Sequence, residues 1–174
     1  MEALVHSLLL ALHNIALVGC AAAPFYNRNL VNTRSQYGPK LFYELDKVLE
    51  DTLQGNAPYC IFFIITLFVT GLGFPLNHYF FHGALKEISF VAMTAGAVKL
   101  AFVCGMLVIM LTIFFRINPE LKKMFAGFSK DSSPDPGAEA AFFKLRKKRK
   151  QRCEICLWFA IVVLVSSAFL GFYT

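Results

Sequence analysis

The sequence predicts an all-α fold, an integral membrane four-helix bundle with an interfacial amphipathic helix between the first and second spans. Apolar residues make up 57% of the 174 residues, and the mean hydropathy of +0.57 is too high for a soluble domain with a polar surface. Four apolar runs are each close to the length that crosses a bilayer as a helix; they cover residues 3–24, 58–80, 88–115 and 155–172. We therefore expect residues 1–174 to form a single transmembrane domain.

The basic residues predict the orientation in the membrane. Of the 17 lysines and arginines, 11 lie between residues 116 and 152, and segment 26–56 carries four more. Such clusters beside spans are typical of cytoplasmic loops that face anionic headgroups. With four spans, loops 26–56 and 116–152 share the cytoplasmic side, and both termini lie on the outer, periplasmic side. The expected partners are membrane lipids, and the placement of the charge argues against nucleic acid.

The first span carries two histidines on one face. His6 and His13 are seven residues apart, which is two helical turns, and His13 lies about 10 Å deeper. A histidine inside a span usually faces the interior of the bundle. His13 is therefore a candidate ligand or site residue, and a hydrogen bond to a neighbouring helix is the alternative.

An amphipathic helix is predicted between the first two spans. Its apolar side chains recur at helical spacing and its charged side chains lie elsewhere; the apolar stripe contains Leu41, Phe42, Leu45, Val48, Leu49 and Leu53. We expect this helix to lie in the cytoplasmic interface with an architectural role.

The end of the second span carries His78 and His82, which share one face because they are four residues apart. Together with His6 they would lie near the outer surface and could hold copper, with Met106 or Met110 below as soft ligands. Two alternatives stay open. The histidines could belong to an aromatic belt at the interface, and methionines on a helix are more often part of a core.

The third span contains one formal charge, Lys99, near its middle. A lone central lysine costs roughly 2.5–3.5 kcal/mol on insertion scales, so we expect a compensating group inside the protein. An intramembrane ionisable residue is by default a functional-site hypothesis, and a side chain that snorkels to the interface is the alternative. Counted from the outer side, His13 and Lys99 both lie roughly 15 Å deep, so they are expected to meet.

Several short motifs resemble a known family. The stretches LHNIA at 12–16 and FYNRNLV at 25–31 resemble the first span and its exit in HemJ-type protoporphyrinogen oxidases and the related CopD-like proteins. Ala97-Val98-Lys99-Leu100 is similar to their third-span lysine motif. The resemblance implies a four-helix protein that binds haem b, with His13 as axial ligand, Lys99 as the matching lysine and Arg28 as a support. The chain departs from the family in two places, because residues 32–43 contain no histidine and the only tryptophan is Trp158.

Three functions follow as expectations. The first is a haem-binding or redox-linked protein of the bacterial cytoplasmic (inner) membrane. The second is a cofactor-free accessory subunit of a larger respiratory or oxidase complex. The third is a copper-handling membrane protein. Because the spans contain neither a pair of carboxylates nor a glycine-rich phosphate loop, no catalytic residues are assigned.

Overall fold

The described part of the chain is helical and contains no strand, which confirms the all-α prediction. A computed structural model describes residues 1–38, 40–85, 89–129 and 135–171. Residues 88 and 172, the expected limits of two spans, lie outside this part. The elements are α1 (Glu2–Ser35), α2 (Tyr43–Gly55), α3 (Ala57–His82), α4 (Phe90–Thr112), the short π-helix η1 (Ile113–Ile117), α5 (Asn118–Ala126) and α6 (Pro136–Gly171).

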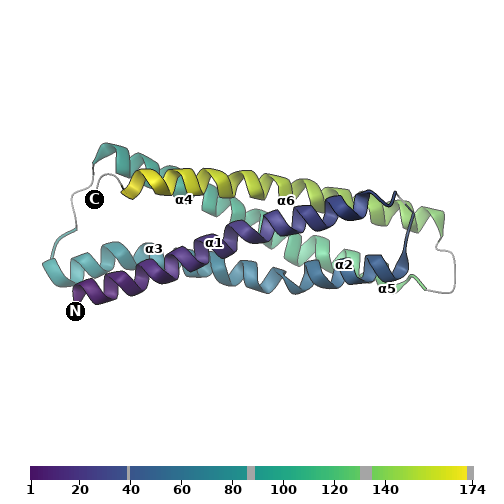
Figure 1. Ribbon diagram of the computed structural model, residues 1–174, viewed down its shortest axis with the longest axis horizontal. Coiled ribbons are helices and arrows are strands. Elements are labelled where there is room, and N and C mark those ends of the chain that lie inside the picture. Colours follow the sequence, from purple (N-terminus) through teal and green to yellow (C-terminus); the bar gives the residue numbers. More distant parts are fainter. Residues whose placement is uncertain (39, 86–88, 130–134, 172–174) are drawn as a thin grey trace.

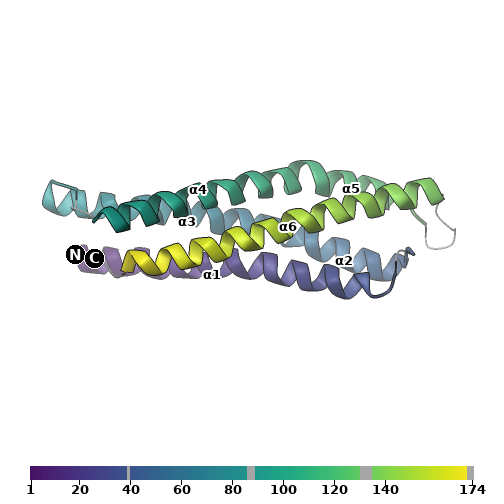
Figure 2. The same cartoon turned by 90° about the horizontal axis from the view of Figure 1, so that it is seen from above.

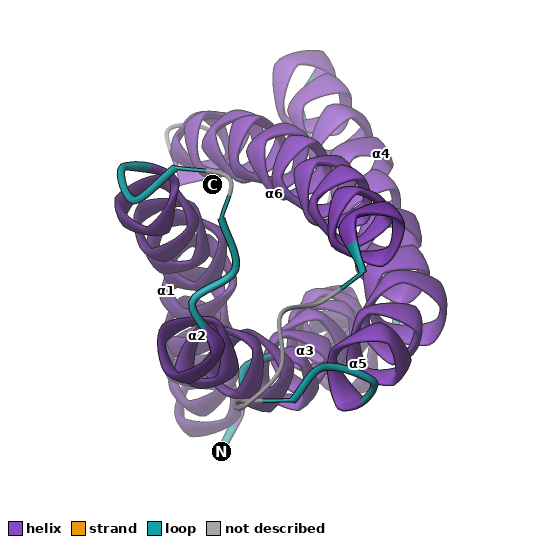
Figure 3. Cartoon of the chain, turned by 90° about the vertical axis from the view of Figure 1, so that its right-hand side faces the viewer, coloured by secondary structure: helices purple, strands orange, loops and turns teal. Residues whose placement is uncertain are grey.

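The long helices run side by side along one axis, with both chain termini at the same end (Figure 1, Figure 2). We call this the outer end of the bundle and the opposite end the inner end. Helix α1 packs mainly against α3, and α4 packs mainly against α6. The contact between α1 and α6 joins the two pairs, whereas α3 and α4 share few contacts (Figure 3). The bundle is therefore two helix pairs with one loosely packed side.

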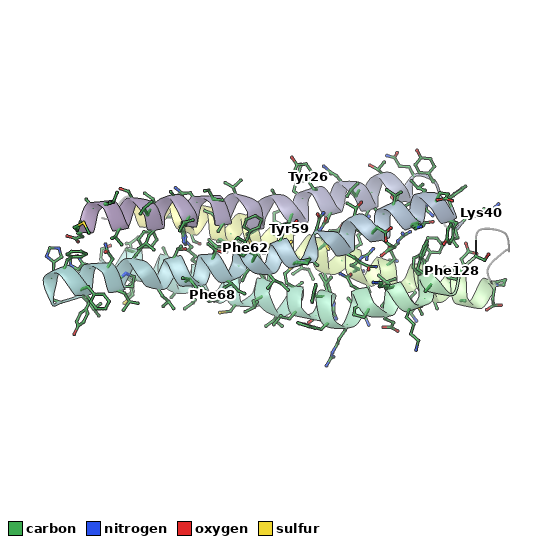
Figure 4. The ribbon with its side chains drawn as sticks, turned by 90° about the horizontal axis from the view of Figure 1, so that it is seen from below. Tyr26, Lys40, Tyr59, Phe62, Phe68 and Phe128 are labelled. Carbon is green, nitrogen blue, oxygen red and sulfur yellow. The ribbon has the colours of Figure 1, made fainter. Side chains whose placement is uncertain are left out.

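Four helical stretches are long and apolar enough to cross a membrane, as the sequence predicts. They cover Glu2–Ser35, Tyr43–His82, Phe90–Ala126 and Pro136–Phe169. At 1.5 Å per residue, stretches of 34–40 residues measure roughly 50–60 Å, against about 30 Å of hydrocarbon. Their most apolar windows are only 17–22% buried, and Tyr26, for example, points away from the bundle (Figure 4). The outward faces are thus apolar and available to lipid.

Most of the described residues in segments 26–56 and 116–152 are helical, beyond the one amphipathic helix that was expected between the first two spans. Helix α1 continues to Ser35, and α6 begins already at Pro136. Helix α2 runs directly into α3, since Asn56 between them has helical angles and its N–H donates to the Thr52 carbonyl. The physical reason is that many of the charged residues pair with one another and so extend the bundle beyond its apolar part.

Helix α2 packs two of its acidic residues inward and leaves part of its apolar stripe exposed. Asp46 and Glu50 are buried beside Leu49 and Leu53, whereas Leu45 and Val48 of the apolar stripe are exposed. The stripe therefore predicts the helix correctly, and its residues are divided between the packed face and the exposed face. Arginines of α1 and α6 cause this, because they draw the carboxylates inward.

The main core lies where α1, α3, α4 and α6 meet, and Met106 belongs to it with only 2% of its surface exposed. This confirms the alternative that Met106 is a core residue. Helix α4 approaches α6 closely at Gly105, where a Cβ would lie 2.7 Å from Cε2 of Phe159. Glycine at this position allows the aromatic ring to pack directly on the α4 backbone.

Candidate functional site: a histidine–lysine pair inside the bundle

The structure brings His13 of α1 and Lys99 of α4 into contact. Lys99 Nζ lies 3.0 Å from His13 Nε2, and His13 Nδ1 lies 2.7 Å from Oγ1 of Thr70 on α3. His13 and Lys99, which the sequence places at the same depth in the membrane, are thus in direct contact. Three helices converge on one imidazole, and the third member, Thr70, was missed by the sequence reasoning.

The hydrogen bonds around Thr70 define the tautomer of His13. Thr70 Oγ1 lies 2.6 Å from the carbonyl oxygen of Thr66, which can only accept, so the hydroxyl donates to that carbonyl. Thr70 then accepts from the Nδ1–H of His13. The Nε2 atom consequently carries the lone pair and accepts from the Lys99 ammonium. The direction of donation therefore runs from Lys99 through His13 and Thr70 to Thr66.

The pair lies in an environment of low polarity. His13 is 7% exposed, Thr70 is 2% exposed and Lys99 is half-buried. The ring of Phe74 packs edge-on against the His13 imidazole, with 5.6 Å between the centroids. Among the residues that the structure describes, no carboxylate forms an ion pair with Lys99. Its positive charge is therefore met only by a neutral imidazole.

Two predicted residues do not join this pair. Arg28 lies fifteen residues beyond His13 on α1, roughly 22 Å along the helix, and its side chain is exposed. His6 is exposed two turns above His13, where its ring packs on Phe74 with 5.3 Å between the centroids. Arg28, which was expected to support the site, therefore does not contact His13.

A second polar cluster lies at the outer end. The rings of His78 and His82 have centroids 4.4 Å apart, as their spacing on α3 predicts. His82 Nε2 lies 3.0 Å from Oε2 of Glu2, and His78 Nδ1 lies 3.7 Å from its Oε1. His6 is not a member of this group. Glu2 thus lies beside the two histidines of α3, and whether His6 takes part in metal binding stays a prediction. The available signal was an acidic residue at the start of the first span, at the depth where the second span ends.

The inner end holds a buried network of charges that the sequence reasoning missed. The Asp46 carboxylate accepts hydrogen bonds from Arg34 at 2.6 and 2.8 Å and from Arg146 at 2.5 Å. Glu50 accepts from Arg146 at 3.1 Å and twice from Arg149 at 2.7 Å. All five side chains are buried. The signal was the spacing of Asp46 and Glu50, four apart, against Arg146 and Arg149, three apart.

The network sets the charge of Asp46, which lies twelve residues before the apolar run 58–80. Burial raises the pKa of the Asp46 carboxyl, but the hydrogen bonds from Arg34 and Arg146 outweigh burial and leave this pKa below its ordinary value. Within the described part of the chain, two buried nitrogens of this network have no hydrogen-bond partner, Nη2 of Arg146 and Nε of Arg149. The Arg146 atom still lies 3.0 Å from Glu50 Oε1, so it is ion-paired although the geometry is poor for a hydrogen bond.

Comparisons with protein-family models, with curated proteins and with solved structures find no match to this chain. The class of this protein is therefore described from its own fold and candidate site. It is an all-helical bundle with four segments able to cross a membrane, a histidine–lysine pair within its apolar part and polar clusters at both ends.

Proposed function

We propose that this is an integral membrane protein that binds haem b at His13 and is redox-linked. The observation that carries the proposal is the contact between His13, which Thr70 holds in one tautomer, and Lys99, a cation without a carboxylate partner among the described residues. The family resemblance of the flanking motifs points in the same direction.

The donor chemistry fits such a cofactor. Ligating histidines commonly donate their other ring N–H to an oxygen, which fixes the ring and exposes the second nitrogen. His13 has this arrangement, so its Nε2 is the atom that would hold iron. Lys99 would serve as a second ligand or as the partner of a propionate, and an anionic group beside it would offset the cost of its buried charge. Bound haem would supply one-electron transfer.

The packing decides from which side a flat ligand could enter. The cavity one turn below the pair, bordered by Leu17 and Cys20, measures about 10 Å³ and is too small for a macrocycle. Helices α3 and α4, in contrast, share few contacts. The open apolar groove of about 280 Å³ at the outer end of α4 is bordered by Phe169 of α6 and by no residue of α3, so it does not mark this entry side. We expect entry from the α3–α4 side, with the Lys99 side chain moving aside.

The location follows from the same proposal. We propose the bacterial cytoplasmic membrane, with both termini on the periplasmic side and the basic inner end in the cytoplasm, in agreement with the positive-inside rule. The exposed Leu45 and Val48 of α2 would contact lipid at the level of the headgroups.

Absorbance spectra of the purified full-length protein, oxidised and reduced, test the proposal. We expect a Soret band in the wild type after titration with haemin. His13→Ala should lose it and Lys99→Ala should shift or weaken it. His6→Ala is the matched control, because His6 lies on the same helix but outside the pair. Absence of a Soret band in the wild type, or its persistence unchanged in His13→Ala and Lys99→Ala, would overturn the proposal. A cofactor-free accessory subunit would then be the better description.

A further inference from the structure

We propose that Glu2, His78 and His82 form a binding site for a divalent first-row transition metal ion at the outer end of the bundle. The site is separate from the histidine–lysine pair, because Glu2 lies eleven residues before His13, roughly 16 Å along α1. It therefore does not depend on whether haem is bound.

The ligand atoms already lie within reach of one ion. One donor atom from each residue lies within 4.8 Å of the other two, and Oε1 of Glu2 lies 3.1 Å from Nε2 of His82 and 3.7 Å from Nδ1 of His78. A tetrahedral zinc ion with bonds of about 2.0–2.2 Å places its ligand atoms roughly 3.3–3.6 Å apart. The observed separations bracket this value, so small side-chain rotations would complete the site.

The backbone explains why these three residues converge. His78 and His82 share one face of the last turns of α3, which ends at Gly83 with a positive φ of 71°. Glu2 lies in the first turn of α1, the helix that packs along α3. Ligands on two packed helices are held more precisely than ligands on loops. A bound ion would therefore join the start of α1 to the end of α3.

The donor set indicates the kind of ion. Two imidazoles and one carboxylate are a known zinc set that leaves a further position open to water. Imidazole and carboxylate suit divalent ions, whereas copper(I) prefers thiolate and thioether ligands. Met106, the soft ligand expected below the histidines, is buried in the main core instead. The side chains of Glu2, His78 and His82 are 37%, 30% and 51% exposed, so the ion can reach them from solution.

Zinc titration of the metal-free, full-length protein in detergent, followed by calorimetry, tests the site. We expect one saturable site in the wild type. Each of the variants Glu2→Gln, His78→Ala and His82→Ala should bind at least about tenfold more weakly, since even loss of a group behind a ligand costs this much. His6→Ala is the matched control and should bind as the wild type does. The purification tag is placed at the C-terminus to leave Glu2 undisturbed.

Two further readouts separate a metal site from a simple hydrogen-bonded cluster. Cobalt should give visible absorption bands in the wild type that disappear in His82→Ala. Zinc should raise the unfolding temperature of the wild type but not of that variant, because an ion that binds only the folded state stabilises it. Unsaturable zinc binding in the wild type, or equal affinity in the wild type and all three ligand variants, would show that Glu2 is only a hydrogen-bond partner.

Discussion

Replacing Asp46 with asparagine should destabilise the fold by about 3 kcal/mol, the lower end of the range for breaking a buried ion pair. The Asp46 side chain is fully buried and accepts hydrogen bonds from Arg34, Arg146 and the backbone N–H of Phe42. Asparagine removes the negative charge and directs N–H donors at the guanidinium groups. The lower end applies because Arg34 also donates to two backbone carbonyls and Arg146 keeps Glu50.

Thermal unfolding of the purified protein measures this effect. For a chain of this length 1 kcal/mol corresponds to about 2–4 °C, so Asp46→Asn should unfold roughly 6–12 °C below the wild type. Asp51→Asn is the matched control, because Asp51 is an exposed acid on the same helix and its loss should change stability by at most about 0.5 kcal/mol. If the two variants unfolded within about 2 °C of each other, the inner network would not stabilise the fold.

Three further predictions follow from the same structure. The pKa of Asp46 is lowered in the folded state. The contribution of the ionised carboxylate to stability is therefore complete above the unfolded pKa of about 3.9 and decreases as the pH drops toward the folded pKa. Between pH 7 and pH 3 the unfolding temperature should fall less in Asp46→Asn than in the wild type. Lys99→Met should raise the unfolding temperature of the haem-free protein, because it removes a lone charge that costs roughly 2.5–3.5 kcal/mol in hydrocarbon, and a decrease would contradict this. Gly105→Ala should cost about 1–3 kcal/mol through overpacking against Phe159, whereas Gly55→Ala, with open space around it, should not; equal unfolding temperatures would refute the close approach.

The spans and the histidine–lysine contact could be predicted because both depend on distance along a helix. A span can be recognised because its apolar run must be long enough to cross the hydrocarbon layer. Antiparallel spans then place residues at the same depth by counting from one surface, and this count matched His13 with Lys99. The count gives the depth of a residue but not the direction in which its side chain points. The contact of Thr70 on α3 with His13 depends on that direction, so it could not be predicted.

The inner network could not be predicted because it depends on helix rotation and on segments far apart in the chain. Seven of the nine residues 144–152 are basic, and nothing local distinguishes Arg146 and Arg149, which turn inward, from their neighbours. Their partners lie almost a hundred residues earlier on α2. A basic cluster beside a span has a sufficient explanation in the positive-inside rule, so the three-residue spacing of Arg146 and Arg149 did not by itself indicate that they pair with Asp46 and Glu50.

The distribution of charge through the bundle bears directly on what Lys99 binds. At the inner end Asp46 and Glu50 partner the buried arginines, and at the outer end Glu2 partners two histidines. Charged partners are thus present at both ends of the bundle, whereas among the described residues the half-buried ammonium of Lys99 contacts the neutral imidazole of His13 and forms no ion pair with a carboxylate. A lysine kept for packing alone would be replaced by an apolar residue at a gain in stability. If haem binds as we propose, a propionate from outside the chain would supply the anionic partner that Lys99 lacks among the described residues.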